Sequence, residues 1–542
     1  MYAVSSLFIS SADAHPFRPF LCIPPREQRD YLQSGAEFSY GAVAASVARL
    51  QARYLEAGFG HGHRVGLLLE NRPDFLVHWL ALNAIGASIM PINPAYRADE
   101  IGYMLSHGEP DLVVSLPARQ ELELALRAQG RRIPCLMVAG DDLADSVTCL
   151  PRAERGPALT GPPSHTSEAA LLYTSGTTAR PKGCILSNEY FVTTGRWYAS
   201  RGGGATYRFG TDRLYSPLPL FHMAGLTVTT MAMIVTGGCL ILPERFNAKY
   251  AWIDMVGCRA SVLHYLGVIV ASLLDQPETP EESRQSLRFS MGAGANPELR
   301  ARAMARFGIP FVEGWGMTET GRSCSNTVEP CHLETNTIGR SEPGFELKIF
   351  DGANKEVPAG TIGELCARFS ADNPRKGFFS GYLKNPEATE AAWRGGWFHT
   401  GDSAWQHEDG AIVFVDRLKH MIRRAGENIS AAEVEGVINL APGVRQSAVV
   451  SGYDSTRQEE VVAFVAAEAP GTLETAQNVF NFCAERLAYY KLPAWIAFVD
   501  ALPMTSTNKI QKHALLGPNK DPGSWPGIFD LRSQKSKIAK QG

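Results

Sequence analysis

The sequence carries no surplus of positive charge. Its 52 lysines and arginines are slightly outnumbered by 55 aspartates and glutamates, which gives a formal net charge of −3 at pH 7. Domains that bind nucleic acids normally show a strongly basic balance or a basic stripe. The charge therefore offers no electrostatic basis for a nucleic-acid partner, and we expect none.

Cysteine is scarce and is not spaced as a disulfide or zinc framework requires. Ten cysteines are scattered between Cys22 and Cys483, no C-x-x-C pair occurs, and the two closest in sequence are Cys324 and Cys331. Such scattered residues are typical of free thiols in a reducing compartment. The pattern argues against disulfides and against a zinc site.

Long apolar runs and targeting signals are also missing. Residues 1–8 have no basic region of the kind that precedes a signal peptide's apolar core. The apolar stretch 262–274 is interrupted and too short to span a bilayer, and residues 539–542 are no peroxisomal address. We expect a cytoplasmic enzyme without stable membrane insertion. A monomer and a homodimer both stay open.

What is present is the composition of a large globular chain. With 542 residues, 45% of them hydrophobic and 20% charged, at least two domains are expected. Residues 39–58 predict a helix capped by Ser39, residues 64–69 a buried strand, and Pro73 the first turn of a further helix. Another strand is expected at residues 87–91. This alternation favours a parallel sheet covered by helices.

One stretch organises our interpretation of the rest. A short apolar strand ending near Tyr173 breaks into a loop from Thr174 to Gly183 that is rich in glycine and hydroxyl residues, and Ser187 and Asn188 then offer a helix cap. Backbone N–H groups and hydroxyls in such a loop can cradle phosphate oxygens, and a lysine adds a point charge. The spacing is not that of a Walker A loop. Taken alone, the loop is equally compatible with a polar surface turn.

The order of residues in this loop resembles the phosphate-binding signature of the adenylate-forming superfamily, which includes acyl-CoA synthetases, peptide-synthetase adenylation domains and beetle luciferases. The usual pattern is Thr-Ser-Gly-Thr-Thr-Gly-x-Pro-Lys-Gly, and this chain departs from it only at Ala179. A β-carbon there penalises positive φ. The resemblance implies phosphate contacts from Thr174, Ser175, Gly176, Thr177, Thr178 and Lys182.

A second segment, Pro219-Leu220-Phe221-His222, resembles one that acyl-CoA synthetases place beside the acyl carboxylate and the thiol tunnel. The resemblance implies a catalytic role for His222, whereas the segment alone would suggest a core histidine. Amino-acid-activating relatives usually have an aspartate in this segment to pair with the substrate ammonium. Its absence argues against an α-amino acid, because an unpaired buried ammonium is costly.

Two further segments resemble the superfamily's nucleotide-binding core. Residues 290–297 form a strand that breaks into small residues, and residues 313–320 match the glycine-aromatic-Gly-Met-Thr-Glu run. By resemblance, Thr318 would contact the α-phosphate and Glu319 would hold Mg²⁺, a hard cation that prefers oxygen ligands. The resemblance also implies nucleotide contacts from Gly294, Ala295, Glu313, Gly314, Trp315 and Gly316.

The later motifs resemble the ribose site, the hinge and the catalytic lysine of the superfamily. Alternating residues in 337–349 and 363–367 indicate antiparallel strands, where the superfamily closes its first domain with a small barrel. Asp402 would accept the ribose hydroxyls, Arg417 would bind ribose or phosphate, Lys419 would be the pivot, and Gly426 would line the CoA tunnel. Lys509 matches the catalytic lysine, although Asn508 replaces the usual glycine.

The resemblance implies an α/β fold in which a large N-terminal domain of stacked α/β sheets and a small barrel, residues 1–418, precedes a small mobile α+β domain, residues 419–542. Residues 517–542 are expected to form a mobile tail. The implied activity is an ATP-dependent acid–thiol ligase that forms acyl-AMP and then acyl-CoA from a carboxylic acid, with ATP, Mg²⁺ and coenzyme A. The hinge and terminal motifs look most like crotonobetaine/carnitine-CoA ligases, which points to carnitine or fatty acid metabolism.

Three other functions stay open at this point. An acyl-adenylating enzyme could load a carrier protein instead of free CoA, although no carrier domain follows the last motif. A luciferase-like oxygenase would share the adenylation half. A catalytically impaired nucleotide-binding scaffold is suggested by Ala179 and Asn508.

Overall fold

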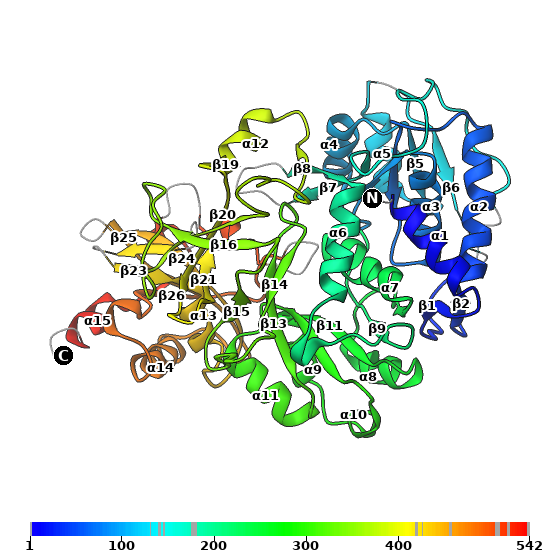
Figure 1. The fold of residues 1–542 in the computed structure, drawn as a ribbon. Helices are drawn as coiled ribbons and strands as arrows, with labels where there is room; N and C mark the ends of the chain where they lie inside the picture. The colour runs from blue at the N-terminus through cyan, green and yellow to red at the C-terminus, as the bar shows by residue number, and fades with distance from the viewer. Residues whose placement is uncertain are drawn as a thin grey trace. The chain divides into compact units, whose positions relative to one another are not determined.

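The computed structural model describes residues 3–130, 132–138, 143–144, 147–174, 181–417, 421–424, 427–454, 458–504, 510–516 and 521–538. The chain forms two compact units (Figure 1). The first comprises Met1–Leu347 and Ala367–Phe398, and the second comprises Lys348–Cys366 and His399–Gly542. Among the described residues, no helix combines the length and the apolar character needed to cross a bilayer.

The first unit contains two large sheets. A seven-stranded sheet has the order β18 (Gly381–Tyr382), β8 (Lys182–Ser187), β7 (Glu168–Thr174), β4 (Ser88–Pro91), β3 (Arg64–Leu68), β5 (Leu112–Ser115), β6 (Cys135–Met137). An eight-stranded sheet has the order β14 (Ser323–Ser325), β13 (Phe311–Gly316), β12 (Phe289–Ala293), β11 (Val262–Leu266), β9 (Arg213–Tyr215), β10 (Cys239–Ile241), β1 (Pro19–Ile23), β2 (Ala36–Ser39). The inner strands of both sheets pair in parallel, as the alternation of helix and strand predicts.

Helices cover these sheets, and the predicted caps are present. The Ser39 side chain accepts a hydrogen bond from the Ala42 backbone, Pro73 opens its helix, and the Ser187 side chain accepts from the Tyr190 backbone. The helices of the first unit are α1 (Val4–Ala14), α2 (Tyr40–Glu56), α3 (Pro73–Ala84), α4 (Ala98–Gly108), α5 (Gln120–Arg127), α6 (Asn188–Ala199), the π-helix η2 (Ala224–Thr229), α7 (Thr230–Thr236), α8 (Ala248–Gly257), α9 (Gly267–Leu274), α10 (Pro280–Arg284), α11 (Pro297–Phe307) and α12 (Pro386–Ala392).

Two parts of the first unit differ from the sequence-based expectation. Residues 3–39, which show little pattern, form α1, β1 and β2. Lys182 and Gly183, expected in the phosphate loop, instead begin strand β8, which pairs antiparallel with β7. The reason is the run Cys184-Ile185-Leu186, in which Cys184 and Leu186 are fully buried, so that the strand continues into the core. The short strands β15 (Thr337–Arg340) and β19 (Trp393–Arg394) complete this unit.

The second unit contains two groups of strands. Strands β21 (Ala411–Arg417), β20 (Trp397–Gln406), β17 (Gly363–Arg368) and β16 (Glu346–Phe350) lie in this order in one sheet, and the chain passes between the units within β16, β17 and β20. A second sheet has the order β23 (Glu427–Ser430), β22 (Met421–Arg424), β25 (Gln458–Ala467), β26 (Trp495–Phe498), β27 (Phe529–Asp530), and β24 (Val444–Asp454) also pairs with β25.

Strand β25 separates two apolar cores. Val461, Ala463 and Val465 pack into a core with α13 (Ala431–Ile438) and α14 (Leu473–Ala484), whereas Val462 and Phe464 pack into a core with Trp495 on the other face. This is the two-residue period of a strand that is buried on both faces. Ser430 caps α13 by accepting from the Glu433 backbone, as predicted. The predicted domain boundary at residue 418 falls outside the described residues and stays a prediction.

The expectation of a mobile tail is corrected for residues 521–538. This segment forms β27 and α15 (Arg532–Ile538), and the Lys535 ammonium is buried. The Lys535 Nζ atom donates to the Glu460 carboxylate at 2.6 Å and to the backbone oxygens of Tyr490 and Leu492. Glu460, also fully buried, accepts from Arg424 Nε at 2.7 Å. A lysine-rich composition predicts mobility only where the charges are solvated, and here one of them is paired inside the unit.

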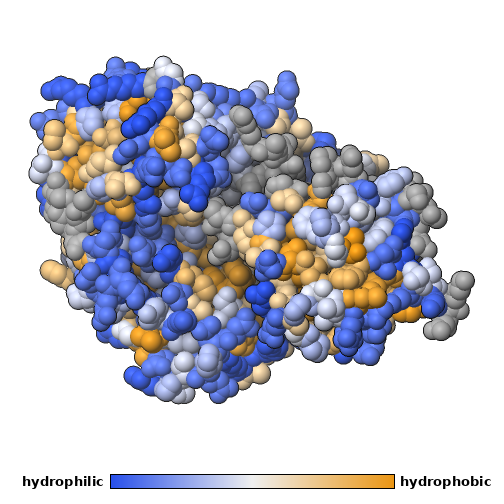
Figure 2. All heavy atoms as spheres, turned by 180° about the vertical axis from the view of Figure 1, so that it is seen from behind, coloured by the Kyte–Doolittle hydropathy of each residue, from blue (hydrophilic) through white to orange (hydrophobic). Residues whose placement is uncertain are grey.

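Hydrophilic and hydrophobic side chains are mixed on the surface of the molecule. Figure 2 shows hydrophilic and hydrophobic residues interspersed over one face. The most exposed large apolar side chains include Phe17 at 94% and Phe209 at 65% of their full accessibility. Isolated apolar residues of this kind are common on globular proteins and need no functional explanation.

We predict that Lys535→Met destabilises the second unit, whereas Lys537→Met does not. Lys537 lies exposed on the same helix and provides the matched control. Removing one partner of a buried ion pair leaves charge poorly compensated and costs about 3 kcal/mol. Calorimetric unfolding of both variants beside the wild type measures the difference. Equal melting temperatures for all three proteins would contradict the structural role given to Lys535.

Candidate nucleotide and acyl site

Thr174 and Lys182, both predicted to contact phosphate, lie directly across from each other. Thr174 is the last residue of β7 and Lys182 the first of β8, and the two are paired in the antiparallel register. Residues 175–180, which join them, lie outside the described part of the chain, so the predicted roles of Ser175, Gly176, Thr177 and Thr178 stay predictions. The structure therefore fixes both ends of the phosphate loop to one strand pair.

Tyr382 connects Lys182 with Glu319. Its hydroxyl donates a hydrogen bond to Glu319 Oε1 at 2.8 Å, and the Lys182 ammonium lies 4.8 Å from the centre of its ring. Strand β18 places Tyr382 here by pairing with β8, opposite Cys184. Burial, and then the nearby Glu319 carboxylate, raise the pKa of Tyr382, so that the phenol stays protonated and remains a donor. The sequence identified Lys182 and Glu319 but gave no role to Tyr382.

The Thr318–Glu319 segment follows the end of β13 and is held by its backbone. The Thr318 carbonyl accepts a hydrogen bond from the Tyr190 hydroxyl at 2.8 Å, and the Glu319 carbonyl accepts from the Phe379 backbone at 2.9 Å. Both side chains are buried. Preceding glycines are required sterically, since a β-carbon on Gly314 would lie 2.9 Å from the Cys324 carbonyl oxygen. The segment is thus rigid on both sides of the predicted metal ligand.

Glu313 is a buried carboxylate that organises the neighbouring strand end. It accepts hydrogen bonds from the Gly294 backbone at 2.5 Å and from the Tyr265 hydroxyl at 2.8 Å, and Arg300 lies 3.6 Å away. Gly294 has φ of +82°, a conformation that favours glycine. Burial raises the pKa of Glu313 from its ordinary value of 4.5 to about 7, although Arg300 opposes the shift. Glu313 therefore holds the Gly294–Ala295 backbone, while its predicted contact with nucleotide stays a prediction.

Arg300 completes this group from helix α11. Its Nη1 atom donates to the Ala295 carbonyl at 2.5 Å, and its Nη2 atom donates to the carbonyls of Leu333 and Thr335. The cation is fully buried. Arg300 and Tyr265 have no signal in the sequence for this role, because it depends on distant partners: Leu333 and Thr335 for Arg300, and Glu313 for Tyr265.

His222 lies where the chain enters the π-helix η2. Its backbone N–H donates to the Pro219 carbonyl at 3.1 Å, and its Nδ1 atom accepts from the Ala224 backbone at 3.3 Å. Gly225 permits this tight turn, because a β-carbon there would lie 2.3 Å from the Pro219 oxygen. π-helical turns are rare and often occur at functional sites. The geometry fixes the imidazole ring, and its role beside an acyl carboxylate stays a prediction.

In the second unit, the two residues predicted to bind ribose form an ion pair. Asp402 on β20 and Arg417 on β21 are directly opposed in the antiparallel register, with Arg417 Nε 2.7 Å from Asp402 Oδ1. Asp402 is fully buried, whereas the Arg417 side chain is 40% exposed. The Asp402 backbone donates to the Thr400 hydroxyl at 3.1 Å. The predicted residues Lys419, Gly426 and Lys509 lie outside the described residues, and their roles stay predictions.

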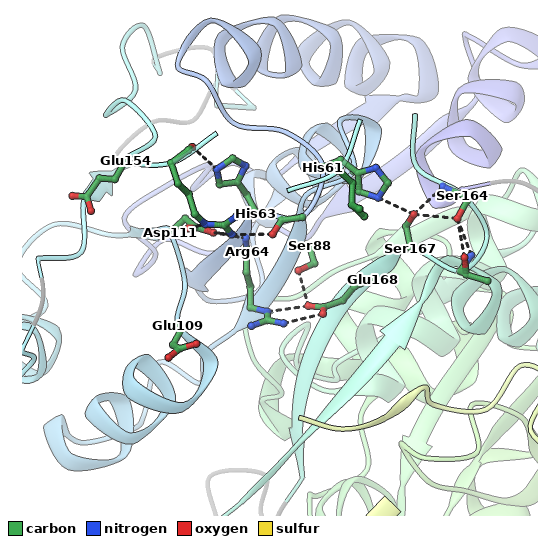
Figure 3. A pocket seen from close by; sticks show the side chains of 15 residues that line it. His61, His63, Arg64, Ser88, Glu109, Asp111, Glu154, Ser164, Ser167 and Glu168 are labelled. Carbon is green, nitrogen blue, oxygen red and sulfur yellow. Dashed lines mark hydrogen bonds and ion pairs between the residues drawn. The ribbon is translucent and has the colours of Figure 1, made fainter. Parts of the chain in front are cut away.

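A large cavity of about 940 Å³ in the first unit is separate from these residues (Figure 3). It opens at the amino ends of β3, β4 and β7, where Arg64, Ser88 and Glu168 begin their strands. At about 3.3 Å per residue, Glu168 is roughly 20 Å from Thr174 along β7. Figure 3 shows Arg64 facing Glu168, and these two groups form paired hydrogen bonds of 2.9 and 2.8 Å.

Two further polar contacts join residues that line this cavity. Arg155 pairs with Asp111 at 2.7 Å, and the Ser88 hydroxyl donates to Glu168 at 2.7 Å. Ligands of open α/β sheets bind at the carboxyl ends of the strands. The nucleotide contacts predicted for Thr174 and Lys182 would lie at the carboxyl end of β7 and stay predictions, and we interpret the cavity as a structural ion-pair region.

The chain matches known families and proteins over most of its length. Residues 10–383 match the AMP-binding enzyme family, and residues 433–509 match the AMP-binding enzyme C-terminal domain. A crotonobetaine/carnitine–CoA ligase of Citrobacter koseri is 32% identical over 88% of this chain and 93% of its own length. A sulfoacetate–CoA ligase of Cupriavidus necator is 31% identical over 95% of this chain and 97% of its own length.

Solved structures give the same result for the fold. The ATP-bound MatB structure from Rhodopseudomonas palustris has a TM-score of 0.79 and 26% identity, covering 95% of this chain and 98% of that one. A benzoate CoA ligase from Burkholderia xenovorans, with 24% identity, has a TM-score of 0.79 and covers 95% of this chain and 100% of its own. The expected fold, a large α/β region followed by a smaller C-terminal region, is confirmed.

The raised pKa of Glu313 leads to a testable pH dependence. Because its folded pKa of about 7 exceeds the ordinary 4.5, the folded chain holds this proton more tightly, and the unfolding free energy falls as pH rises through this window. Glu313→Gln removes the titration. Its one side-chain oxygen still accepts from the Gly294 backbone, and its amide NH2 can donate to the Tyr265 hydroxyl. We expect the variant to gain stability relative to wild type, by up to about 3 kcal/mol, between about pH 5 and pH 8. Chemical denaturation across this range measures the difference, and parallel curves would refute the assignment.

Proposed function

The chain belongs to the AMP-binding enzyme family, and from this premise we propose that it is an ATP-dependent acid–thiol ligase. It would activate a carboxylic acid as acyl-AMP, with release of pyrophosphate, and transfer the acyl group to coenzyme A, with release of AMP. The observation that carries the proposal is the group formed by Lys182, Tyr382 and Glu319, in which a cation and a buried carboxylate are held on one phenol beside the phosphate loop.

In the first half-reaction, an oxygen of the substrate carboxylate attacks the α-phosphorus of ATP. A new acyl–oxygen–phosphorus linkage forms, and the bond from this phosphorus to the bridging oxygen of pyrophosphate breaks. Phosphoryl chemistry of this kind depends on neutralising charge more than on covalent help from the protein. Lys182 and the loop from Thr174 would bind the phosphates, and Lys509 would approach from the second unit.

Glu319 fits the requirements of a magnesium ligand. It is a carboxylate, the hard oxygen donor that Mg²⁺ prefers, and the hydrogen bond from Tyr382 fixes the orientation of one of its oxygens. Bound there, Mg²⁺ would supply positive charge to the phosphates. Glu319 and Thr318 are positioned for this by the backbone contacts of Tyr190 and Phe379.

In the second half-reaction, the CoA thiol loses its proton to solvent and its sulfur attacks the acyl carbon. The carbon–sulfur bond of the thioester forms, and the bond from the acyl carbon to the phosphate oxygen of AMP breaks. The proposed rearrangement turns the small domain at Lys419, which withdraws Lys509 and brings Gly426 to the thiol tunnel. Hinges of this kind need only a few residues that absorb backbone rotation. Closure would also keep water from the acyl-adenylate.

The acid itself is proposed only by class. The relatives named above act on crotonobetaine or carnitine and on sulfoacetate, which are small acids with a second charged group. The segment around His222 has no carboxylate to pair with a substrate ammonium. We therefore favour a small organic acid other than an α-amino acid, with walls of the acyl site formed near Tyr265 and Gly294.

The first expected outcome concerns the acid and the acceptor. With ATP and Mg²⁺, pyrophosphate release should require one class of carboxylic acid and should increase when free CoA is added. The panel comprises carnitine, crotonobetaine, sulfoacetate, benzoate, short and medium fatty acids, and amino acids. Release that is indifferent to CoA would favour loading of a carrier protein. Measurable ATP binding without release for any acid would favour the impaired scaffold and draw attention to Ala179 and Asn508.

The second expected outcome separates the half-reactions. Lys509→Ala should slow acyl-adenylate formation by about 100-fold or more, since it removes a positive charge from the transition state. Thioester formation from supplied acyl-adenylate and CoA should be spared. Rapid-quench measurement of each half-reaction tests this, with Lys537→Ala as the control on an exposed lysine. Equal loss in both half-reactions would argue against the two-conformation mechanism.

A further inference from the structure

We propose that Glu364, Cys366 and His399 form a binding site for a divalent cation of intermediate softness, with Zn²⁺ as the best candidate. The three residues belong to the second unit, Glu364 and Cys366 on β17 and His399 on β20. They are distinct from Glu319, the residue proposed to bind Mg²⁺. Neither the family nor the activity proposed above requires such a site.

The side chains converge on one imidazole nitrogen. His399 Nδ1 lies 2.8 Å from Glu364 Oε2 and 3.4 Å from Cys366 Sγ, and one donor atom from each residue lies within 4.8 Å of the others. Residues two apart on a strand project from the same face, which explains why β17 presents both Glu364 and Cys366 to His399.

These separations are close to those of a zinc coordination sphere. With Zn–S of about 2.3 Å and Zn–N and Zn–O of about 2.0–2.2 Å, tetrahedral ligands lie roughly 3.4–3.6 Å apart. The nitrogen–sulfur distance of 3.4 Å already agrees with this spacing. The nitrogen–oxygen distance of 2.8 Å requires the Glu364 carboxylate to retreat by about 0.6 Å.

The chemistry of the donors also favours a cation. A carboxylate oxygen, a thiolate sulfur and an imidazole nitrogen are each established zinc ligands, and here one of each lies in the same cluster. A cation at the centre would be bound by thiolate, carboxylate and neutral imidazole together. Binding breaks the S–H bond of Cys366, releases that proton to solvent and forms the metal–sulfur bond, so that affinity rises with pH.

Charge balance suits the burial of the cluster. Cys366 is fully buried and His399 is 9% exposed. One thiolate and one carboxylate cancel the two charges of Zn²⁺, which avoids a net charge in a poorly solvated place. Mg²⁺ and Ca²⁺ prefer oxygen ligands, whereas thiolate and imidazole select zinc and similar ions, so millimolar Mg²⁺ should not compete.

The cluster is connected to the predicted ribose residue. Glu364 Oε1 accepts a hydrogen bond from the Gly401 backbone at 3.1 Å, and the Thr400 hydroxyl donates to the Leu365 carbonyl at 2.6 Å. Asp402 follows immediately. If the proposed function holds, a metal that moves the Glu364 carboxylate away from His399 Nδ1 shifts this segment and weakens the use of ATP.

The test measures metal binding by the intact chain, first without nucleotide. Chelator-treated protein in buffer with Mg²⁺ is dialysed against Zn²⁺, and bound zinc is counted by mass spectrometry. One equivalent should bind wild type, and Cys366→Ser and His399→Asn should each weaken its affinity about 100-fold or more. Cys483→Ser is the matched control, because Cys483 is a fully buried free thiol of the same unit outside the cluster.

Substitution by Co²⁺ gives a second readout that does not depend on a variant folding. Wild type should develop a thiolate-to-cobalt charge-transfer band and the visible bands of tetrahedral cobalt, and the Cys483→Ser protein should develop the same bands. Unchanged zinc affinity in both cluster variants, or a cobalt spectrum without a thiolate band, would overturn the proposal.

The effect of Zn²⁺ on activity distinguishes the metal site from the proposed function. Zn²⁺ should raise the KM for ATP in wild type and leave the Cys366→Ser value unchanged. A chain that binds zinc through Cys366 but activates no acid would keep the metal site and reject the proposed function. A chain that activates an acid but shows no cluster-dependent zinc binding would do the reverse.

Discussion

The hydrogen bond from Tyr382 to Glu319 is the contact on which the first unit's candidate chemistry depends. It links three elements that are distant in sequence, since β18 carries the phenol, β8 carries Lys182 and the turn after β13 carries the carboxylate. A buried carboxylate without a donor costs about 1–3 kcal/mol or more. The phenol supplies such a donor while its ring lies 4.8 Å from the Lys182 ammonium, so that one side chain contacts both charges.

The same constraint, that no charge is buried without a partner, also shapes the rest of the molecule. Glu460 is shared by Arg424 and Lys535, and Glu313 is held by Tyr265 with Arg300 nearby. In each group one partner arrives from a segment far along the chain. These polar clusters therefore determine which remote segments pack together, and they do so more specifically than apolar packing alone. Such clusters are also suitable places for ligand-binding sites, because their side chains are already held in a fixed geometry.

Local rules predicted the elements whose causes are local. The cap at Ser39, the proline at Pro73 and the cap at Ser187 determine α2, α3 and α6. Ordered motifs named Lys182, Glu319, Asp402 and Arg417 as candidate site residues, and their roles stay predictions. The elements that the sequence did not predict depend on contacts with residues far away along the chain. Helix α1 is held at its start by Asn83 and Asn188 and strand β1 pairs with β10, while α15 is held by Glu460. Tyr382 was overlooked for the same reason, since its importance lies in a partner 63 residues earlier.

The proposed metal cluster shows how such remote contacts can separate two cation chemistries within one chain. The absence of C-x-x-C pairs argued against a zinc site. The cluster gives no such signal, because Cys366 and His399 are 33 residues apart and only the pairing of strands brings their side chains together. Glu319 presents hard oxygen to its surroundings, whereas the cluster combines oxygen with nitrogen and sulfur. Ligand softness rather than affinity alone then decides which ion each site takes. If the chain uses Mg²⁺ with ATP, as proposed, it can therefore carry a second, thiolate-containing site without the two ions exchanging places.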